Sequence, residues 1–250
     1  MLDVHAPHEA THTWGDFFIH IATIAVGLLI AVALEQTVEA VHRHHEVAAL
    51  REDLHAETEQ ILADSQRADK AMDYELQWLA GRIAQVRVAA WDGKPLAAEE
   101  PNQMPYFASP DIPIWRSAKA AGKTSLLTKG EINAYAEVEY VQTHMDSMSD
   151  DARKAVANQT SFVEKFPKLS NGAPDFTKAS REDLQTYLGL LTANEVELKN
   201  YHAWVRVLLG AELAVRDGKT KLEDIYAVER AQSKSRTTTT GFSPSQFSSQ

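Results

Sequence analysis

The sequence predicts an all-α protein in which one N-terminal transmembrane helix continues into a long helix, packed with further long helices as an antiparallel bundle or coiled coil. Three observations predict this fold. An apolar run over residues 17–34 is long enough to cross a bilayer. No glycine or proline occurs between Gly27 and Gly81, so a helix can continue well beyond that run. Apolar residues then recur at heptad spacing in three long segments.

The pattern divides the chain into six segments. They are an N-terminal tail (1–13), a transmembrane anchor (14–36), a long juxtamembrane helix (37–90), a proline-rich crossing loop (91–113), a helical bundle domain (114–232) and a low-complexity tail (233–250). One continuous helix from Trp14 to about Ala90 would be about 115 Å long. Five prolines then exclude helix or central strand from the crossing loop.

The composition excludes several functions. Hydrophobic residues make up 44% and charged residues 24% of the 250 residues, as in a folded chain rather than a disordered one. The net charge of −10 argues against nucleic acid as a partner, because phosphate backbones are bound by clustered basic side chains. The chain has no cysteine, so it has neither disulfides nor thiolate metal sites.

The membrane segment is the apolar run over residues 17–34, in which His20 is the strongly polar residue. As a helix it would be about 27 Å long, close to the ~30 Å of a bilayer core. Trp14 lies about one turn before it, where an indole suits the headgroup region. Two alternatives are a buried core helix and a signal peptide cleaved after Ala33. No Lys or Arg precedes the run, which favours an uncleaved anchor.

The orientation of this anchor stays open. Arg43 and Arg51 follow the span and no basic residue precedes it, so the positive-inside rule puts the large domain in the cytoplasm. That asymmetry amounts to two residues only. We therefore expect a single-pass protein of the inner (cytoplasmic) membrane, with membrane lipid as one partner, and leave the side of the domain open.

A strip of small residues runs along one face of the anchor. Thr23, Gly27 and Ala31 recur every four residues, a spacing that lets two membrane helices approach closely. Small residues are also common in membrane helices that do not pair. The strip is a candidate oligomer interface, and we expect a homo-oligomer or a subunit of a membrane protein complex.

The bundle domain begins with recognisable helix boundaries. A short helix over residues 114–121 should end at Gly122, a natural left-handed position. Thr128 and Glu131 have the spacing of a capping box for the next long helix.

The last long helix is predicted from Ser180 and Asp183, which have capping-box spacing, and Gly218 should close it before a short final helix. Asn194 interrupts its apolar seam and is interpreted as a register-setting core contact. The seam also lapses at Glu212, which predicts a small bend or an exposed last turn near Gly210.

Histidines are concentrated near the N-terminus, where eight of the ten occur in the first 55 residues. Three Glu-x-x-His pairs resemble the ligand pattern of di-iron bundles. A di-iron site needs two such pairs on facing helices, whereas two of these share one helix at a separation of about 20 Å. The pairs are Glu9/His12, Glu39/His42 and Glu52/His55.

Two smaller histidine sites remain as candidates. His42, His45 and Glu46 share one helix face and could hold a metal ion, although a polar collar at the bilayer surface is the favoured interpretation. His20 is ionisable within the apolar run, a position that is often functional, and two copies could bind haem in a dimer. Its place near the start of the run also lets it simply reach the headgroups.

Catalytic signatures are missing from the sequence. It contains no Gly-x-Ser-x-Gly and no Gly-x-Gly-x-x-Gly. Gly-Lys-Thr occurs at 122–124 and 218–220, but Ser117 and Leu213 stand where a P-loop requires an earlier glycine. We therefore predict no enzyme.

A possible pocket is predicted where Trp115, Tyr135 and Tyr140 come together between helices, which is where bundles bind small ligands. The alternative is a corner of the core in which Trp115 is the plug.

Two stretches resemble an uncharacterised bacterial family of single-span, membrane-anchored helical proteins that carry a domain of unknown function. They are ATIAVGLLIAVALEQTVEAVHRHHE (22–46) and IWRSAKAAGKTSLLTKGEINAYAEVEY (114–140). The resemblance covers about a fifth of the chain and implies an anchor followed by a bundle, without implying an activity. Members of the family usually have basic N-termini, which implies an extracytoplasmic domain. This chain has no Lys or Arg in its first 42 residues.

Taken together, these features predict a non-enzymatic, membrane-anchored helical scaffold or accessory subunit of a membrane complex, with no cofactor. The alternative is a metal- or haem-binding redox protein that uses the N-terminal histidines.

Overall fold

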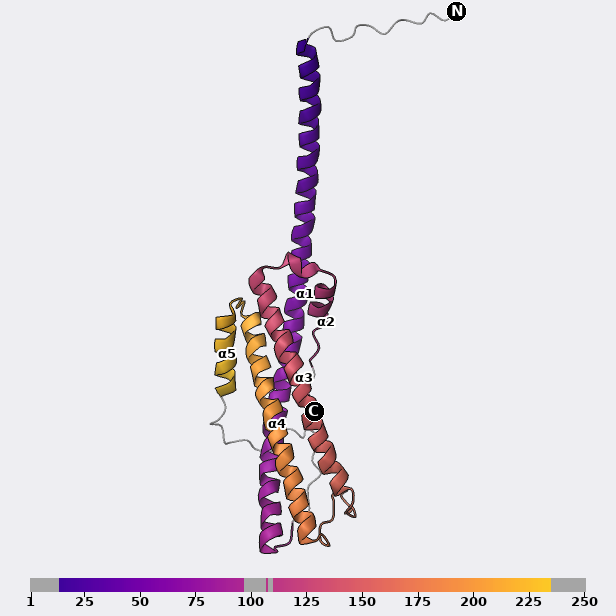
Figure 1. Ribbon diagram of the computed structural model, residues 1–250, viewed down its shortest axis with the longest axis vertical. Helices are drawn as coiled ribbons and strands as arrows, with labels where there is room; N and C mark the ends of the chain where they lie inside the picture. Colours follow the sequence, from indigo (N-terminus) through magenta and orange to yellow (C-terminus); the bar gives the residue numbers. More distant parts are fainter. Residues whose placement is uncertain (1–13, 97–106, 108–109, 235–250) are drawn as a thin grey trace, which may run out of the picture. The chain divides into compact units, whose positions relative to one another are not determined.

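The computed structural model describes residues 14–96, 107 and 110–234. The predicted tail at 1–13, most of the tail at 233–250 and much of the crossing loop lie outside these residues. Within them the regular structure is helical, apart from one isolated bridge between Lys168 and Pro174. The prediction of an all-α bundle is therefore confirmed. The elements are α1 (Trp14–Asp92), α2 (Pro113–Ala120), a 3-10 helix η1 (Lys123–Leu126), α3 (Lys129–Val163), α4 (Arg181–Arg216) and α5 (Leu222–Lys234) (Figure 1).

The long first helix contributes to two compact units, which divide between Arg51 and Glu52. In the first unit, the described part of the chain is α1 alone, and it carries the apolar run. In the second unit, the rest of α1 packs with the other helices. Gly93 follows the helix with φ 68°, a left-handed conformation that favours glycine and ends the helix two residues beyond the predicted end near Ala90.

The predicted capping boxes are confirmed. Glu131 N–H donates to Thr128 Oγ1 (3.3 Å), and Thr128 N–H donates to Glu131 Oε2 (2.7 Å), so two otherwise unpaired backbone donors are satisfied at the start of α3. Ser180 and Asp183 make the same reciprocal pair at the start of α4. Gly122 takes the left-handed conformation expected of it, with φ 70°.

Helix α4 runs antiparallel to both of its long neighbours in the second unit. Against α3, His144 stacks on Trp204 and Gln159 meets Asn194, so residue numbers rise along one helix as they fall along the other. The pairing of Ser65 with Glu212 and of Arg82 with Tyr187 shows the same for α1 and α4.

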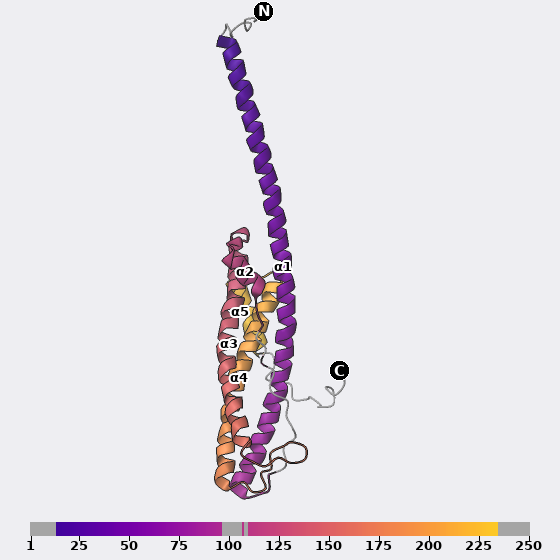
Figure 2. The same cartoon turned by 90° about the vertical axis from the view of Figure 1, so that its right-hand side faces the viewer.

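Helices α1 and α3 consequently run parallel, and the antiparallel prediction holds for α4 only (Figure 2). The parallel arrangement requires the chain to return from the end of α1 to the level of Glu57, a distance of roughly 50 Å along the helix. About 20 residues separate Asp92 from Pro113. An extended chain of that length can span roughly 65 Å, so the return is possible.

The heptad seams form the core. All eight predicted seam positions of α1 and all seven of the regular part of α4 are buried. They are Leu54, Thr58, Ile61, Ser65, Ala68, Met72, Leu79 and Val86 in α1, and Tyr187, Leu191, Asn194, Leu198, Tyr201, Val205 and Leu208 in α4.

Of the two alternatives predicted near Gly210, a small bend or an exposed last turn, the exposed turn is wrong. Helix α4 continues to Arg216, and Glu212 is 0% exposed. A Cβ atom on Gly210 would lie 2.4 Å from Glu229 Cα on α5, which is closer than any side chain can approach. Glycine is therefore present here because α5 packs directly against the backbone of α4.

Candidate functional site

The apolar run of α1 is fully exposed in the single chain. None of its most apolar 18-residue window is buried, and by length and composition it could cross a membrane. Twelve large apolar side chains between Trp14 and Leu34 are exposed to solvent. They are Trp14, Phe17, Phe18, Ile19, Ile21, Ile24, Val26, Leu28, Leu29, Ile30, Val32 and Leu34.

The small-residue strip on this segment faces open space. A Cβ on Gly27 would meet no atom within 4 Å, and Ala31 is exposed. Thr23 Oγ1 donates to the Ile19 carbonyl at 2.8 Å, so its hydroxyl is satisfied within the helix and needs no partner from another chain. The interface itself stays a prediction.

Within the described residues, two of the N-terminal histidines contact polar groups of their own helix, while His5, His8 and His12 lie outside these residues. His20 Nδ1 lies 2.7 Å from the Asp16 carbonyl oxygen. His42 Nε2 lies 3.4 Å from Glu46 Oε1, while the ring of His45 is 6.2 Å from that of its neighbour His44. Among the described residues, His42, His45 and Glu46 do not converge as three metal ligands.

A different group does converge, in the core between α1 and α4. Side-chain ligand atoms of Asp69, Asp73 and His202 lie within 4.8 Å of one another. The Arg206 guanidinium already binds both carboxylates, through Nε to Asp69 (3.0 Å) and Nη2 to Asp73 (2.9 Å). His202 Nε2 is 2.8 Å from Asp69 Oδ1. The Arg206 guanidinium supplies the positive charge that a metal ion would otherwise supply to the two carboxylates. The group is therefore an ion-pair cluster rather than a metal site.

The charge on Asp69 is strongly stabilised. Burial alone would raise the pKa of this carboxyl, but hydrogen bonds and charge from His202 and Arg206 outweigh burial and lower the pKa to about 2. Asp69 lies 133 positions before His202 and 137 before Arg206, so no local pattern indicated the cluster.

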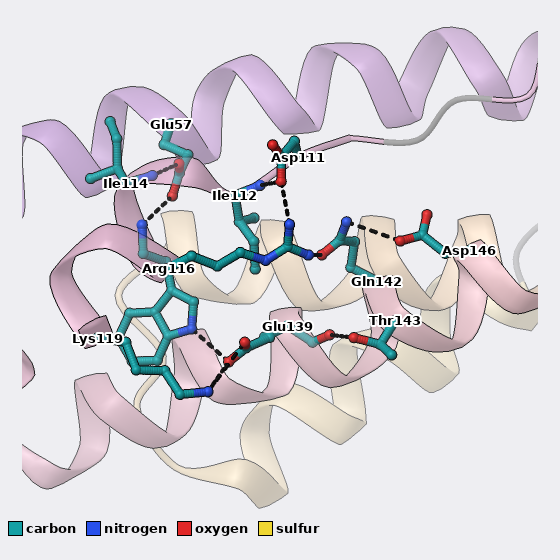
Figure 3. A network of polar contacts seen from close by, with 11 residues as sticks. Glu57, Asp111, Ile112, Ile114, Arg116, Lys119, Glu139, Gln142, Thr143 and Asp146 are labelled. Carbon is teal, nitrogen blue, oxygen red and sulfur yellow. Dashed lines mark hydrogen bonds and ion pairs between the residues drawn. The ribbon is translucent and has the colours of Figure 1, made fainter.

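A second polar network joins α1, α2 and α3 (Figure 3). The Glu57 carboxylate of α1 accepts hydrogen bonds from the backbone N–H groups of Ile114 (2.6 Å) and Trp115 (3.2 Å) at the start of α2. Ile112, at the N-cap position, has no side chain that can accept these bonds. Glu57 therefore caps α2 from another helix. Burial raises its pKa, although the two backbone bonds act in the opposite direction.

Trp115 is the central side chain of this network. It is 2% exposed, and its ring stacks on Tyr135 with 5.5 Å between centroids. Its Nε1–H donates to Glu139 Oε2 at 2.9 Å, and Lys119 Nζ donates to the same oxygen at 2.9 Å. Burial opposes ionisation of Glu139, but these two donors outweigh it and lower its pKa. The arrangement favours the interpretation of Trp115 as a core plug.

A small cavity lies beside Trp115 and Tyr135. Its volume is about 10 Å³, which is room for about one water molecule, whereas pockets for small organic ligands measure about 300 Å³ or more. Tyr140, the third residue of the predicted pocket, is not part of its lining. Its side chain is 53% exposed, and its ring lies 4.3 Å from that of His144.

Glu212 also lines this cavity and was not predicted as a site residue. Ser65 Oγ donates to Glu212 Oε1 at 3.1 Å, while Oε2 is buried without a hydrogen-bond partner. Burial raises its pKa well above 4.5, and the charge of Asp64 acts in the same direction. The sequence signal was its position, four residues after Leu208, where the seam requires a buried side chain.

Glu229 on α5 is a second buried carboxyl. It is 8% exposed, its Oε1 has no hydrogen-bond partner, and its backbone packs against Gly210. Burial, followed by the charge of Glu137 on α3, raises its pKa from 4.5 to about 7.

Comparison with models of protein families, with curated proteins and with solved structures finds no match to this chain. The resemblance to an uncharacterised bacterial family stays a prediction. A functional proposal consequently rests on the residues and their geometry.

Proposed function

We propose that this chain is a non-enzymatic, single-pass protein of the inner (cytoplasmic) membrane, and that its helical bundle acts as a scaffold or accessory subunit in a membrane complex. The observation that carries the proposal is the unburied apolar run in α1. The rest of the described chain buries its apolar seams, so this run is the exception that needs an explanation.

Burial of the apolar run in an apolar environment would be energetically favourable. Burying one large apolar side chain is worth about 1.5–3 kcal/mol, so covering twelve is worth roughly 20 kcal/mol or more. That exceeds the typical stability of a whole domain, which is about 5–15 kcal/mol. A bilayer core supplies the cover, because 18 helical residues extend about 27 Å and the core is about 30 Å thick.

Membrane fractionation tests the anchor. The full-length chain with a C-terminal epitope should remain in the pellet after alkaline carbonate extraction and be released by detergent. Replacing Leu28 and Leu29 together with arginine should release it, because each arginine at the centre of a span costs about 2.5–3.5 kcal/mol.

The matched control puts two arginines on the bundle, at Val88 and Val196, which are 39% and 50% exposed. This variant should stay in the pellet. N-terminal sequencing of the membrane fraction separates an uncleaved anchor from a cleaved signal peptide. A full-length chain that stays monodisperse in plain buffer would contradict the proposal.

The scaffold role is supported by the architecture of the second unit, in which the long helices bury continuous seams of mainly apolar side chains. The redox alternative requires metal or haem ligands from the N-terminal histidines, and in the described part of one chain His42, His45 and Glu46 do not converge as ligands. Metal analysis and a visible spectrum of the purified protein distinguish the two. Stoichiometric iron or a Soret band would reject the scaffold role in favour of the redox protein.

A further inference from the structure

We propose that Glu212, where α4 packs against α1, forms a proton-binding site with one water molecule in the cavity beside Trp115, and that the proton is bound at neutral pH. The proposal goes beyond the scaffold role and does not depend on it. It rests on three features of the second unit: a fully buried carboxyl, its unpaired oxygen and a water-sized space at that carboxyl.

The carboxyl is incompletely satisfied by the protein. Glu212 is 0% exposed, and Ser65 Oγ at 3.1 Å is bonded to Oε1 only. Oε2 is buried without a hydrogen-bond partner. A buried polar atom left unpaired is costly, so such atoms are generally paired with protein or with an ordered water molecule.

The cavity provides the missing partner. A volume of about 10 Å³ accommodates about one water molecule, provided that two to four polar groups surround it. Besides Glu212, the lining residues include three that carry side-chain oxygens, namely Thr58, Tyr135 and Glu57. A water here accepts a hydrogen bond from protonated Glu212 Oε2 and donates to the other oxygens.

A proton rather than a counter-ion neutralises Glu212. The titratable groups toward it are Asp64 and Glu57 on α1 and Tyr135 on α3, while Glu229 on α5 packs on the neighbouring turn of α4. None of these groups carries a positive charge. An ionised carboxylate among them would be both desolvated and repelled, which agrees with the raised pKa of Glu212.

Proton release from this site has a structural consequence. It would place a negative charge at the buried contact between α1 and α4, next to the acidic Asp64. Water must then enter, or the helices must separate, before the charge is tolerated. Binding of one proton is therefore linked to closure of this contact.

Infrared spectroscopy of the full-length protein in detergent tests the site. The test uses a Glu229→Gln background, because Glu229, whose pKa is raised to about 7, would contribute a band of its own. In this background the carbonyl-stretch band of a protonated carboxylic acid should be present at pH 7, shift in D₂O, and disappear when Glu212→Gln is added. Glu59→Gln, at an exposed position on α1, is the matched control and should retain the band. A missing band in the Glu229→Gln background, or one that survives the addition of Glu212→Gln, would overturn the proposal.

Two further measurements test the water molecule and the proton separately. Thr58→Val removes one hydroxyl from the cavity lining and should shift the Glu212 band, because it changes the hydrogen bonds of the water; an unshifted band would reject the water. Loss of the band on addition of sodium or calcium chloride at constant pH would show a metal ion in place of the proton. If Glu212→Gln does not fold, Ser65→Ala keeps the test open, since it should shift the band without removing it.

Discussion

Neutralising Glu229 should change how the stability of the bundle depends on pH. The folded-state pKa of this carboxyl is raised from 4.5 to about 7, a difference that corresponds to about 3 kcal/mol at 1.36 kcal/mol per pKa unit. Because the folded state binds the proton more tightly, this stability is fully present below pH 4.5 and is lost as the pH rises through 7. Glu229→Gln cannot ionise, so it should not show this loss.

The assay is urea unfolding of the full-length chain in detergent, followed by tryptophan fluorescence at pH 5 and pH 8. We expect the stability of Glu229→Gln relative to wild type to increase by about 2–3 kcal/mol between these pH values. Glu223→Gln, at an exposed position on the same helix, is the matched control and should follow the wild type. Any contribution of Glu212 is common to all three proteins and cancels. An identical pH dependence in wild type and Glu229→Gln would refute the assignment.

Three further predictions test the packing and the anchor. Trp115→Ala should cost about 3–5 kcal/mol and lower the melting temperature by several degrees, because it empties a fully packed position; a small loss would instead favour the pocket interpretation. Gly210→Ala should cost about 1–3 kcal/mol and increase amide exchange in α5, whereas Gly189→Ala on an open face of α4 should not destabilise. Gly27→Leu should weaken crosslinking between chains in membranes, and unchanged crosslinking would remove that face from the interface.

Local patterns in the sequence predicted most of the helices correctly. The capping boxes at Thr128 and Ser180 depend on residues three positions apart, and such short-range signals survive in any tertiary setting. The heptad seams of α1 and α4 likewise predicted which faces are buried. The parallel arrangement of α1 and α3 could not be predicted, because it depends on where a crossing segment returns rather than on any pattern within it.

The polar residues of the core were harder to predict, because their surroundings also depend on how the helices pack and not on a local pattern. Glu212 occupies a seam position, but a charged residue at such a position is equally compatible with an exposed turn. Its burial depends on α1 and α3, because Ser65 donates a hydrogen bond to it and Thr58 and Tyr135 line the same cavity. The cluster of Asp69, His202 and Arg206 depends on packing between helices far apart in the sequence.

The buried acidic groups of the bundle are stabilised in three different ways, and this gives its pH dependence two opposing limbs. Glu57 accepts backbone N–H groups, Asp69 accepts Arg206 and His202, and Glu229 is stable in the core only while protonated. The pKa of Asp69 is lowered from 3.8 to about 2, so its contribution is present above 3.8 and is lost as the pH falls through 2. The contribution of Glu229 is lost in the opposite direction, as the pH rises through 7. The bundle should therefore be most stable at mildly acidic pH, with the alkaline limb due to Glu229 at the α4–α5 contact and to Glu212, whose pKa is also raised, and the acid limb due to the α1–α4 ion pairs.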